Sequence, residues 1–92
     1  MDLLNYNKKG VLLMTVTVML SATLRAYAPG YRPADGLSVE LAPGSSAAAL
    51  AQKIGLPEEE IKIVMINGRR GALDRILADG DRVGFFPALA GG

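Results

Sequence analysis

The sequence contains no cysteine, no histidine and no tryptophan. Without cysteine and histidine the chain has no disulfide, no thiol nucleophile and none of the usual zinc ligands. It also lacks the side chain best suited to proton transfer near neutral pH. The acidic residues, including the run Glu58, Glu59 and Glu60, stand where turns and helix ends carry charge. We therefore expect a protein that is not an enzyme, with no metal site and no bound cofactor.

The sequence also lacks a large excess of positive or negative charge, because it has ten Lys and Arg residues and nine Asp and Glu residues. A net charge of +1 gives no electrostatic case for a nucleic-acid partner. One basic cluster exists, but aspartates are interspersed in it, so we interpret it as a solvated face. Its members are Arg69, Arg70, Arg75 and Arg82, with Asp74, Asp79 and Asp81 between them.

The longest uncharged run, residues 10–24, follows two lysines and precedes Ala26-Tyr27-Ala28, as in a secretory signal. Its apolar residues, however, occupy every second position, which is typical of a half-buried strand. The run is also too short for a membrane span of about 20 residues. We therefore predict a first strand over residues 14–26, no membrane partner and a cytoplasmic location.

Residues 1–13 are mixed in character and precede the clean alternation that begins at Met14. They are either a flexible N-terminal arm or a mis-assigned start, with Met14 as the true first residue. In both cases we expect the folded domain to span residues 14–87, followed by a flexible tail over residues 88–92.

The middle of the chain predicts a strand and a helix. Residues 37–41 alternate again, and Pro43-Gly44 ends the pattern. A hydroxyl at Ser45 or Ser46 can cap the helix that follows. The apolar stripe of that helix has the spacing i, i+3, i+4 and i+7, at Ala47, Leu50, Ala51 and Ile54.

The last third predicts two more strands, over residues 61–66 and 82–86. The first ends at the turn signal Asn67-Gly68, and Pro87 ends the second. Residues 73–77 are ambiguous, and we interpret them as a short turn of helix. This order predicts an α+β fold with one main helix packed on a mixed sheet. The expected core is Val16, Val18, Leu20, Val39, Leu50, Ile54, Ile63, Met65 and Val83.

The chain ends in Ala88-Leu89-Ala90-Gly91-Gly92. A frayed end is the simplest interpretation. A terminal diglycine, however, lacks β-carbons, so it can thread a narrow channel and present its carboxylate with no side chain beside it. The five residues after Pro87 could extend roughly 17 Å. That reach suits delivery of the carboxylate into the active site of another protein.

Three segments resemble a known family: the turn 66–69, the stretch 77–83 and the ending 85–92. Over residues 14–92 the chain resembles β-grasp sulfur carriers, closest to the small subunit of molybdopterin synthase and more distantly to the thiamine sulfur carrier. The resemblance implies a ubiquitin-like β-grasp fold, with one main helix on a mixed four- to five-stranded sheet.

The resemblance also implies a reaction cycle. An adenylating activating enzyme would use ATP to join AMP to the carboxylate of Gly92, and persulfide sulfur would then convert that carboxylate to a thiocarboxylate. The large subunit of molybdopterin synthase would accept the tail, with Gly91 and Ala90 threading its channel. The chain itself would be at most the non-catalytic small subunit of a sulfurtransferase complex.

Three apolar residues at the base of the tail, Phe86, Pro87 and Leu89, are poorly placed for the core, so we expect them to bind partner enzymes. The alternative for Phe86 is that it closes the bottom of the core. Other functions also stay open: sulfur transfer for thiamine, cysteine or a tungsten cofactor, a protein modifier joined to lysines, or a ubiquitin-like binding module with an inert tail. The chain departs from the family at Ala88, where a second proline is common, and in the loop 28–36.

Overall fold

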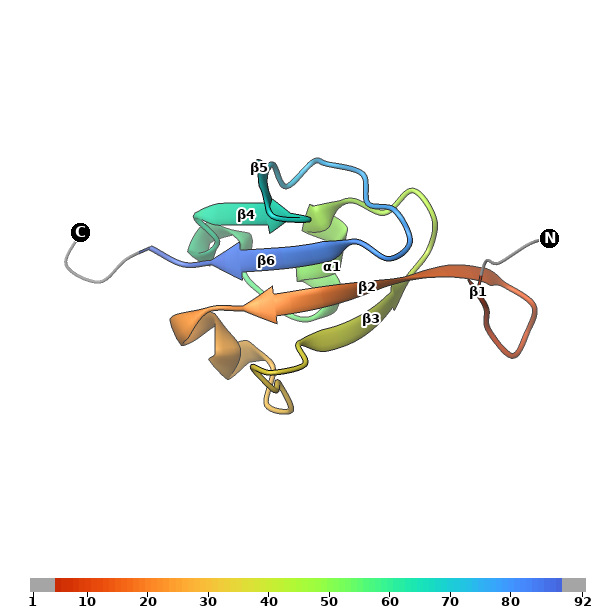
Figure 1. The fold of residues 1–92 in the computed structure, drawn as a ribbon, viewed down its shortest axis with the longest axis horizontal. Coiled ribbons are helices and arrows are strands. Elements are labelled where there is room, and N and C mark those ends of the chain that lie inside the picture. Colours follow the sequence, from red (N-terminus) through yellow and green to blue (C-terminus); the bar gives the residue numbers. More distant parts are fainter. Residues whose placement is uncertain (1–4, 89–92) are drawn as a thin grey trace.

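The structure is a computed structural model that describes residues 5–88. Its strands and helices follow one another along the chain as drawn in Figure 1. In chain order they are β1 (Asn5–Tyr6), β2 (Leu12–Leu20), the 3-10 helix η1 (Ala22–Tyr27), β3 (Leu37–Leu41), α1 (Ala47–Lys53), the 3-10 helix η2 (Glu58–Glu60), β4 (Ile63–Ile66), β5 (Arg69–Gly71) and β6 (Arg82–Phe86).

The strands form one six-stranded mixed sheet in the order β1-β2-β6-β4-β5, with β3 also paired to β2. β2 and β6 run parallel, and every other pairing is antiparallel. α1 crosses one face of this sheet, behind β6 in Figure 1, and leaves the other face open. The predicted α+β class and the β-grasp fold are therefore confirmed.

The core lies between α1 and the covered face of the sheet. Every second residue of β2 from Met14 to Leu20 is buried there, as the alternation predicts. Leu50 and Ala51 of α1 are also fully buried. The Ser46 side chain accepts a hydrogen bond from the amide of Ala49, which confirms the predicted cap. The predicted core residues Val16, Val18, Leu20, Val39, Leu50 and Val83 are all buried, and Ile54 packs half-buried at the core edge.

The predicted register of β4 is wrong. Val64 and Ile66 enter the core, whereas Ile63 and Met65 are half-buried on the opposite face. All four residues of this strand are apolar, so no alternation of polarity marks the inward face. The pairing of β4 with β6, Val64 opposite Phe85, decides the register.

The first strand is shorter at its end than predicted. β2 ends at Leu20, and Ala22, with a φ of 50°, turns the chain into η1. Leu24 is still buried, but Ala22 and Ala26 are exposed. β3 pairs with β2 as far as Val18, and β6 pairs with it as far as Leu20. The amide of Ser21 still donates to the carbonyl of Phe85, and the positive φ of Ala22 then turns the chain away from the sheet.

Two further predictions need correction. Residues 73–77 do not form a helical turn: Ile76 forms an isolated bridge with Ser46, and the amide of Leu77 donates to the carbonyl of Ser45. β5, which follows the Asn67-Gly68 turn, was not predicted from the sequence because its three residues include two arginines and a glycine.

At the N-terminus, β1 pairs with the first residues of β2, Asn5 with Leu13 and Tyr6 with Leu12. This hairpin lies at the end of the molecule opposite the end of β6 (Figure 1). The division into arm, domain and tail stays a prediction. None of the helices within residues 5–88 has the length and apolar character that crossing a bilayer requires.

Candidate functional site at the base of the tail

The tail leaves the domain from β6, a central strand held by β2 on one side and β4 on the other. The amide of Lys62 donates to the carbonyl of Phe86 at 2.8 Å. The next residue, Pro87, has no N–H and cannot extend the sheet. Pro87 is half-buried and Ala88 is exposed. The backbone hydrogen bonds of the sheet therefore hold the chain as far as Phe86.

The two phenylalanines of β6 face opposite sides of the sheet. Phe85 is fully buried in the core, whereas Phe86 is half-buried on the open face. A β-carbon added at Gly84 would lie 3.1 Å from Cε2 of Phe86 and 3.8 Å from Cβ of Met65. The absence of a side chain at Gly84 therefore gives the Phe86 ring its room on this face.

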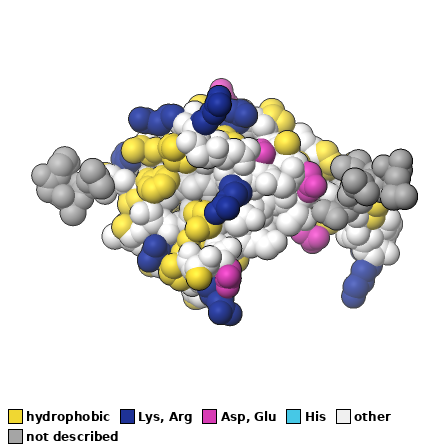
Figure 2. Space-filling model, viewed as in Figure 1, with side chains coloured by type: hydrophobic (Ala, Val, Ile, Leu, Met, Phe, Trp, Pro, Cys, Tyr) yellow, Lys and Arg dark blue, Asp and Glu magenta, His cyan; other side chains and the backbone are white. Residues whose placement is uncertain are grey.

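A hollow of about 410 Å³ opens beside Phe86 on the same face. Met19 of β2 and Met65 of β4 line it together with Phe86, and Arg82 and the Asn67-Gly68 turn complete its wall. Figure 2 shows this side of the molecule, where apolar side chains gather around the end of β6 with cationic side chains among them. Flexible methionines around an aromatic ring are typical of surfaces that adapt to more than one partner.

The loop after β2 is held against this surface. Tyr31 accepts a hydrogen bond from the amide of Leu20 at 3.0 Å, and Nε of Arg25 donates to the Leu20 carbonyl at 2.9 Å. The Arg25 guanidinium also lies 5.6 Å from the centre of the Tyr31 ring, within cation–π range. A second hollow, lined by Met19, Arg25, Tyr31, Pro33 and Phe86, joins this loop to the tail base.

On the other side of the tail base, Tyr27 donates a hydrogen bond to Oε2 of Glu60 at 3.1 Å. This bond raises the pKa of Tyr27 above its usual value of 10.0, and desolvation and the negative charges of Glu60 and Glu59 add to the effect. Glu59, Glu60 and Lys62 line a hollow that also includes Pro87 and Ala88. The chain therefore leaves the domain between an apolar face and a charged one.

Asn67 and Asp81 form a small hydrogen-bond network at the edge of the arginine- and aspartate-rich stretch 69–82, and we call it the Asn67–Asp81 clasp. The Asn67 side chain donates to Oδ1 of Asp81 at 2.8 Å and accepts from the Arg82 amide at 2.9 Å. Oδ2 of Asp81 accepts from the Ala78 amide at 2.8 Å. This clasp joins two of the segments that carry the family resemblance. Across residues 5–88, no three Asp, Glu, His or Cys side chains are grouped as a metal site.

Of the predicted site residues, Phe86 and Pro87 come together at the end of β6. Leu89, Ala90, Gly91 and Gly92 lie outside the described residues. Three further residues of this surface were missed, namely Met19, Met65 and Arg25. Met19 could have been found, because it is an apolar residue at the outward position of β2, where Thr15 and Thr17 are polar.

Comparison with known proteins agrees with the fold. A family model described as Mut7-C ubiquitin matches residues 13–91. A search of curated protein sequences gives no significant match. The sequence-based resemblance to β-grasp sulfur carriers is confirmed for the fold by solved structures from three proteins.

The first is the HVO 2177 protein of Haloferax volcanii, 22% identical with a TM-score of 0.67, covering 87% of this chain and 88% of that one. The second, from Pyrococcus furiosus, is a candidate molybdopterin converting factor, subunit 1. It is 27% identical with a TM-score of 0.63, and the match covers 83% of this chain and 99% of that one. The third is the small archaeal modifier protein 1 of H. volcanii. It is 18% identical with a TM-score of 0.65, and the match covers 83% of this chain and 99% of that one.

Proposed function

The chain belongs to the Mut7-C ubiquitin family, and from this membership we propose that it is a sulfur carrier protein. In this role the carboxylate of Gly92 is adenylated and converted to a thiocarboxylate, which donates sulfur in the biosynthesis of molybdopterin, for a molybdenum or tungsten cofactor. The chain is a carrier and not an enzyme. It binds no cofactor, and ATP is used by its activating enzyme.

The observation that carries this proposal is the exit of the tail from a central strand. Phe85 and the Lys62–Phe86 hydrogen bond hold β6 in the domain, and Pro87 begins a segment that cannot extend the sheet. The remaining residues end in Gly91-Gly92. This base supports the proposal that Gly92 offers a terminal carboxylate to a partner enzyme.

The chemistry needs activation, because a carboxylate is a poor electrophile. A Gly92 carboxylate oxygen attacks the α-phosphorus of ATP, and pyrophosphate leaves. The terminal sulfur of a persulfide on the sulfur-donating enzyme then attacks the acyl carbon, and AMP leaves. A second thiol of that enzyme attacks the resulting acyl disulfide, so that the thiocarboxylate leaves and the enzyme retains a disulfide. With no thiol and no imidazole in the chain, these steps depend on groups that the activating enzyme supplies.

We further propose that the open face binds the partner enzymes, an adenylating activating enzyme and the large subunit of molybdopterin synthase. Phe86, Pro87 and Leu89 are the contacts predicted from the sequence, and Met19 and Met65 extend the apolar surface beside them. Arg82 at its edge is exposed and would favour an acidic rim on the partner.

A second candidate function is a ubiquitin-like protein modifier joined to lysines through the same activated Gly92. The likeness to the small archaeal modifier protein 1 favours it. Sulfur carriage for thiamine or cysteine synthesis uses the same carboxylate and differs only in the enzyme that accepts the sulfur. All of these functions require an activated C-terminal glycine.

The test is mass spectrometry of the chain co-expressed with its cognate activating enzyme. We expect the intact protein to gain the mass difference between sulfur and oxygen. Deleting Gly92, or adding one residue after it, should abolish this gain without changing the melting temperature. A lengthened chain that loads sulfur untrimmed would contradict the proposal.

A second measurement separates the two candidate functions. Incubation with the large synthase subunit and a pterin precursor should consume the thiocarboxylate if the chain is the molybdopterin carrier. Conjugates with a Gly92–lysine isopeptide bond, found by peptide sequencing, would instead identify the chain as a modifier.

A further inference from the structure

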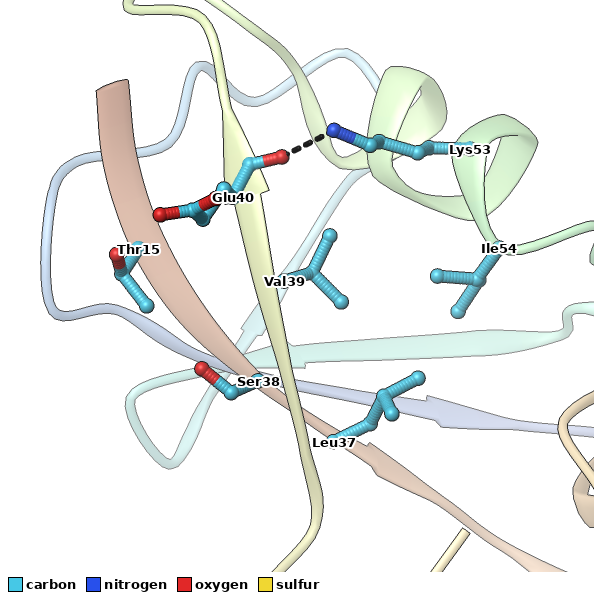
Figure 3. Close-up of a pocket in the computed structure, with 7 residues that line it drawn as sticks. All are labelled: Thr15, Leu37, Ser38, Val39, Glu40, Lys53 and Ile54. Carbon is cyan, nitrogen blue, oxygen red and sulfur yellow. Dashed lines mark hydrogen bonds between the residues drawn. The ribbon is translucent and has the colours of Figure 1, made fainter. Parts of the chain in front are cut away.

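Side-chain hydrogen bonds fix the backbone on both sides of the sheet. Beside β3, Nζ of Lys53 donates to the carbonyl of Glu40, which ties the end of α1 to the strand (Figure 3). Beside β6, the Asn67–Asp81 clasp ties the turn between β4 and β5 to the start of that strand. The clasp holds a residue that is chemically reactive, because Asn67 is followed by a glycine.

An Asn-Gly pair can react through its own backbone. The amide proton of Gly68 goes to hydroxide, the amide nitrogen attacks Cγ of Asn67, and Nδ2 takes a proton from water and leaves as ammonia. Water then opens either carbonyl of the resulting succinimide, which gives aspartate or isoaspartate at position 67. Glycine favours this attack because it has no β-carbon to crowd the nitrogen. Both residues are exposed at the tip of the β4–β5 turn, so water reaches them.

The backbone of the folded turn opposes this attack. Asn67 has a φ of 53° and Gly68 a φ of 80°, so both lie in the left-handed region. Residues of that region have a ψ of about +30 to +60°. Closing the succinimide ring requires the Cα–C bond of Asn67 to rotate out of this range, so that the Gly68 nitrogen comes over Cγ. The reaction therefore needs the turn to open first.

The clasp decides how readily the turn opens. β5 has three residues, and its first two, Arg69 and Arg70, are exposed, so the strand itself holds the turn weakly. Nδ2 of Asn67 donates to Oδ1 of Asp81 at 2.8 Å, and Oδ1 of Asn67 accepts from the Arg82 amide at 2.9 Å. Both ends of the reactive carboxamide are thus bonded, and the ring can close only after these bonds break.

The product of deamidation does not restore the clasp. The Nδ2 donor is replaced by a carboxylate oxygen, which would face the Asp81 carboxylate at the former hydrogen-bond distance of 2.8 Å. Two like charges at that distance repel each other, so the clasp opens at neutral pH. Asn67 and Gly68 also line the hollow beside Phe86. The modification therefore changes the open face as well as the turn.

We propose that Asn67 is a deamidation site that the Asn67–Asp81 clasp keeps unreacted, and that its reaction opens the clasp permanently and reshapes the hollow beside Phe86. Asp81 is a positioning residue in this reaction, because it acts through the Asn67 side chain. The chemistry needs neither a partner enzyme nor Gly92, so it stands apart from the proposed function.

The test is the rate of deamidation of the folded chain at mildly alkaline pH, below its melting temperature. Trypsin cuts after Lys62 and Arg69, and mass spectrometry of the peptide 63–69 measures the deamidated fraction. We expect the folded chain to react more slowly than the same peptide made synthetically. Asp81→Ala should accelerate the folded chain about tenfold or more, the factor for losing a hydrogen bond to a charged group.

Two control variants separate the clasp from stability in general. Asp79→Ala removes a bond of the same loop, to the Thr15 amide at 2.7 Å, and Lys53→Met removes the bond to the Glu40 carbonyl across the sheet. Both should deamidate at the natural rate. Equal acceleration in either control, no acceleration in Asp81→Ala, or a folded chain that reacts as fast as the peptide would overturn the proposal.

A second measurement needs no substitution. In nitrogen-15 spectra, the purified deamidated chain should show shifted amide signals for Ala78 and Arg82, which the clasp binds, and an unshifted signal for Leu50 in the core. Unshifted signals for Ala78 and Arg82 would contradict the opening of the clasp.

Binding to the activating enzyme tests the effect on the open face. The deamidated chain should bind it about two- to fivefold more weakly than the fresh chain, the range for one exposed charge. Equal binding by both chains would contradict that effect. A fresh chain that neither binds the enzyme nor loads sulfur would contradict the proposed function alone, because the deamidation rates and the spectra are measured without a partner.

Discussion

Leu50 is the residue through which α1 joins the sheet, and it is fully buried. Replacing it by alanine leaves a cavity below the helix, so we expect the free energy of unfolding to fall by about 2–5 kcal/mol. Denaturation by urea measures this change. The matched control is Ile76→Ala, because Ile76 is 58% exposed and its truncation should cost little. Similar losses in both variants would mean that burial does not decide the cost.

The structure raises the pKa of Tyr27 above its usual value. Its hydrogen bond to Glu60 stabilises the neutral phenol, so the folded pKa lies above the unfolded one near 10.0. The unfolded chain therefore loses this proton first, and the bond's contribution to stability is present below pH 10 and lost as the pH rises further.

Tyrosinate absorbance should show Tyr27 titrating at higher pH in the natural chain than in Glu60→Gln. Tyr27→Phe should remove that titration and weaken the alkaline loss of stability above pH 10. An unchanged Tyr27 titration in Glu60→Gln would contradict the assigned cause.

The β1–β2 hairpin is an element that adds little to the core. Within residues 5–88, β1 pairs with β2 through Asn5, Tyr6, Leu12 and Leu13, and the buried series of β2 begins at Met14. A chain that starts at Met14 should therefore melt within about 5 °C of the full chain, which corresponds to about 1 kcal/mol. Calorimetry is the measurement. A much larger fall would show that the hairpin supports the sheet.

At the scale of the whole molecule, the two faces of β6 separate folding from binding. Phe86→Ala removes a half-buried ring from the open face, so we expect the fold to remain and binding to the activating enzyme to weaken about tenfold, as for an interface anchor. Phe85→Ala is the matched control, because truncating its fully buried ring should cost about 3–5 kcal/mol of stability. Calorimetric titration and thermal melts measure the two effects. If Phe86→Ala unfolds the protein and causes no separate binding defect, Phe86 is a structural residue.

Much of the fold was predictable from local patterns. The helix cap at Ser46, the alternation from Met14 to Leu20 and the strand ended by Pro87 each depend on neighbouring residues, so they can be read along the chain. The tail was identified in the same way, because Gly91 and Gly92 are a local feature. These patterns determined the α+β class and directed attention to the C-terminus.

Tertiary structure decided the rest. The four apolar residues of β4 carry no local mark of their inward face, and pairing with β6 buries Val64 and Ile66. The alternation continues past Leu20, yet β2 ends there because the chain turns into η1 at Ala22. The open face likewise joins Met19, Met65 and Phe86 from three strands. The sequence by itself determined the strands β3 and β6, the helix α1 with its cap, and the glycine tail, because the signals for these are local. Which side of each strand is buried, where pairing ends and which residues meet beside the tail depend on contacts between distant segments, so only the folded chain decides them.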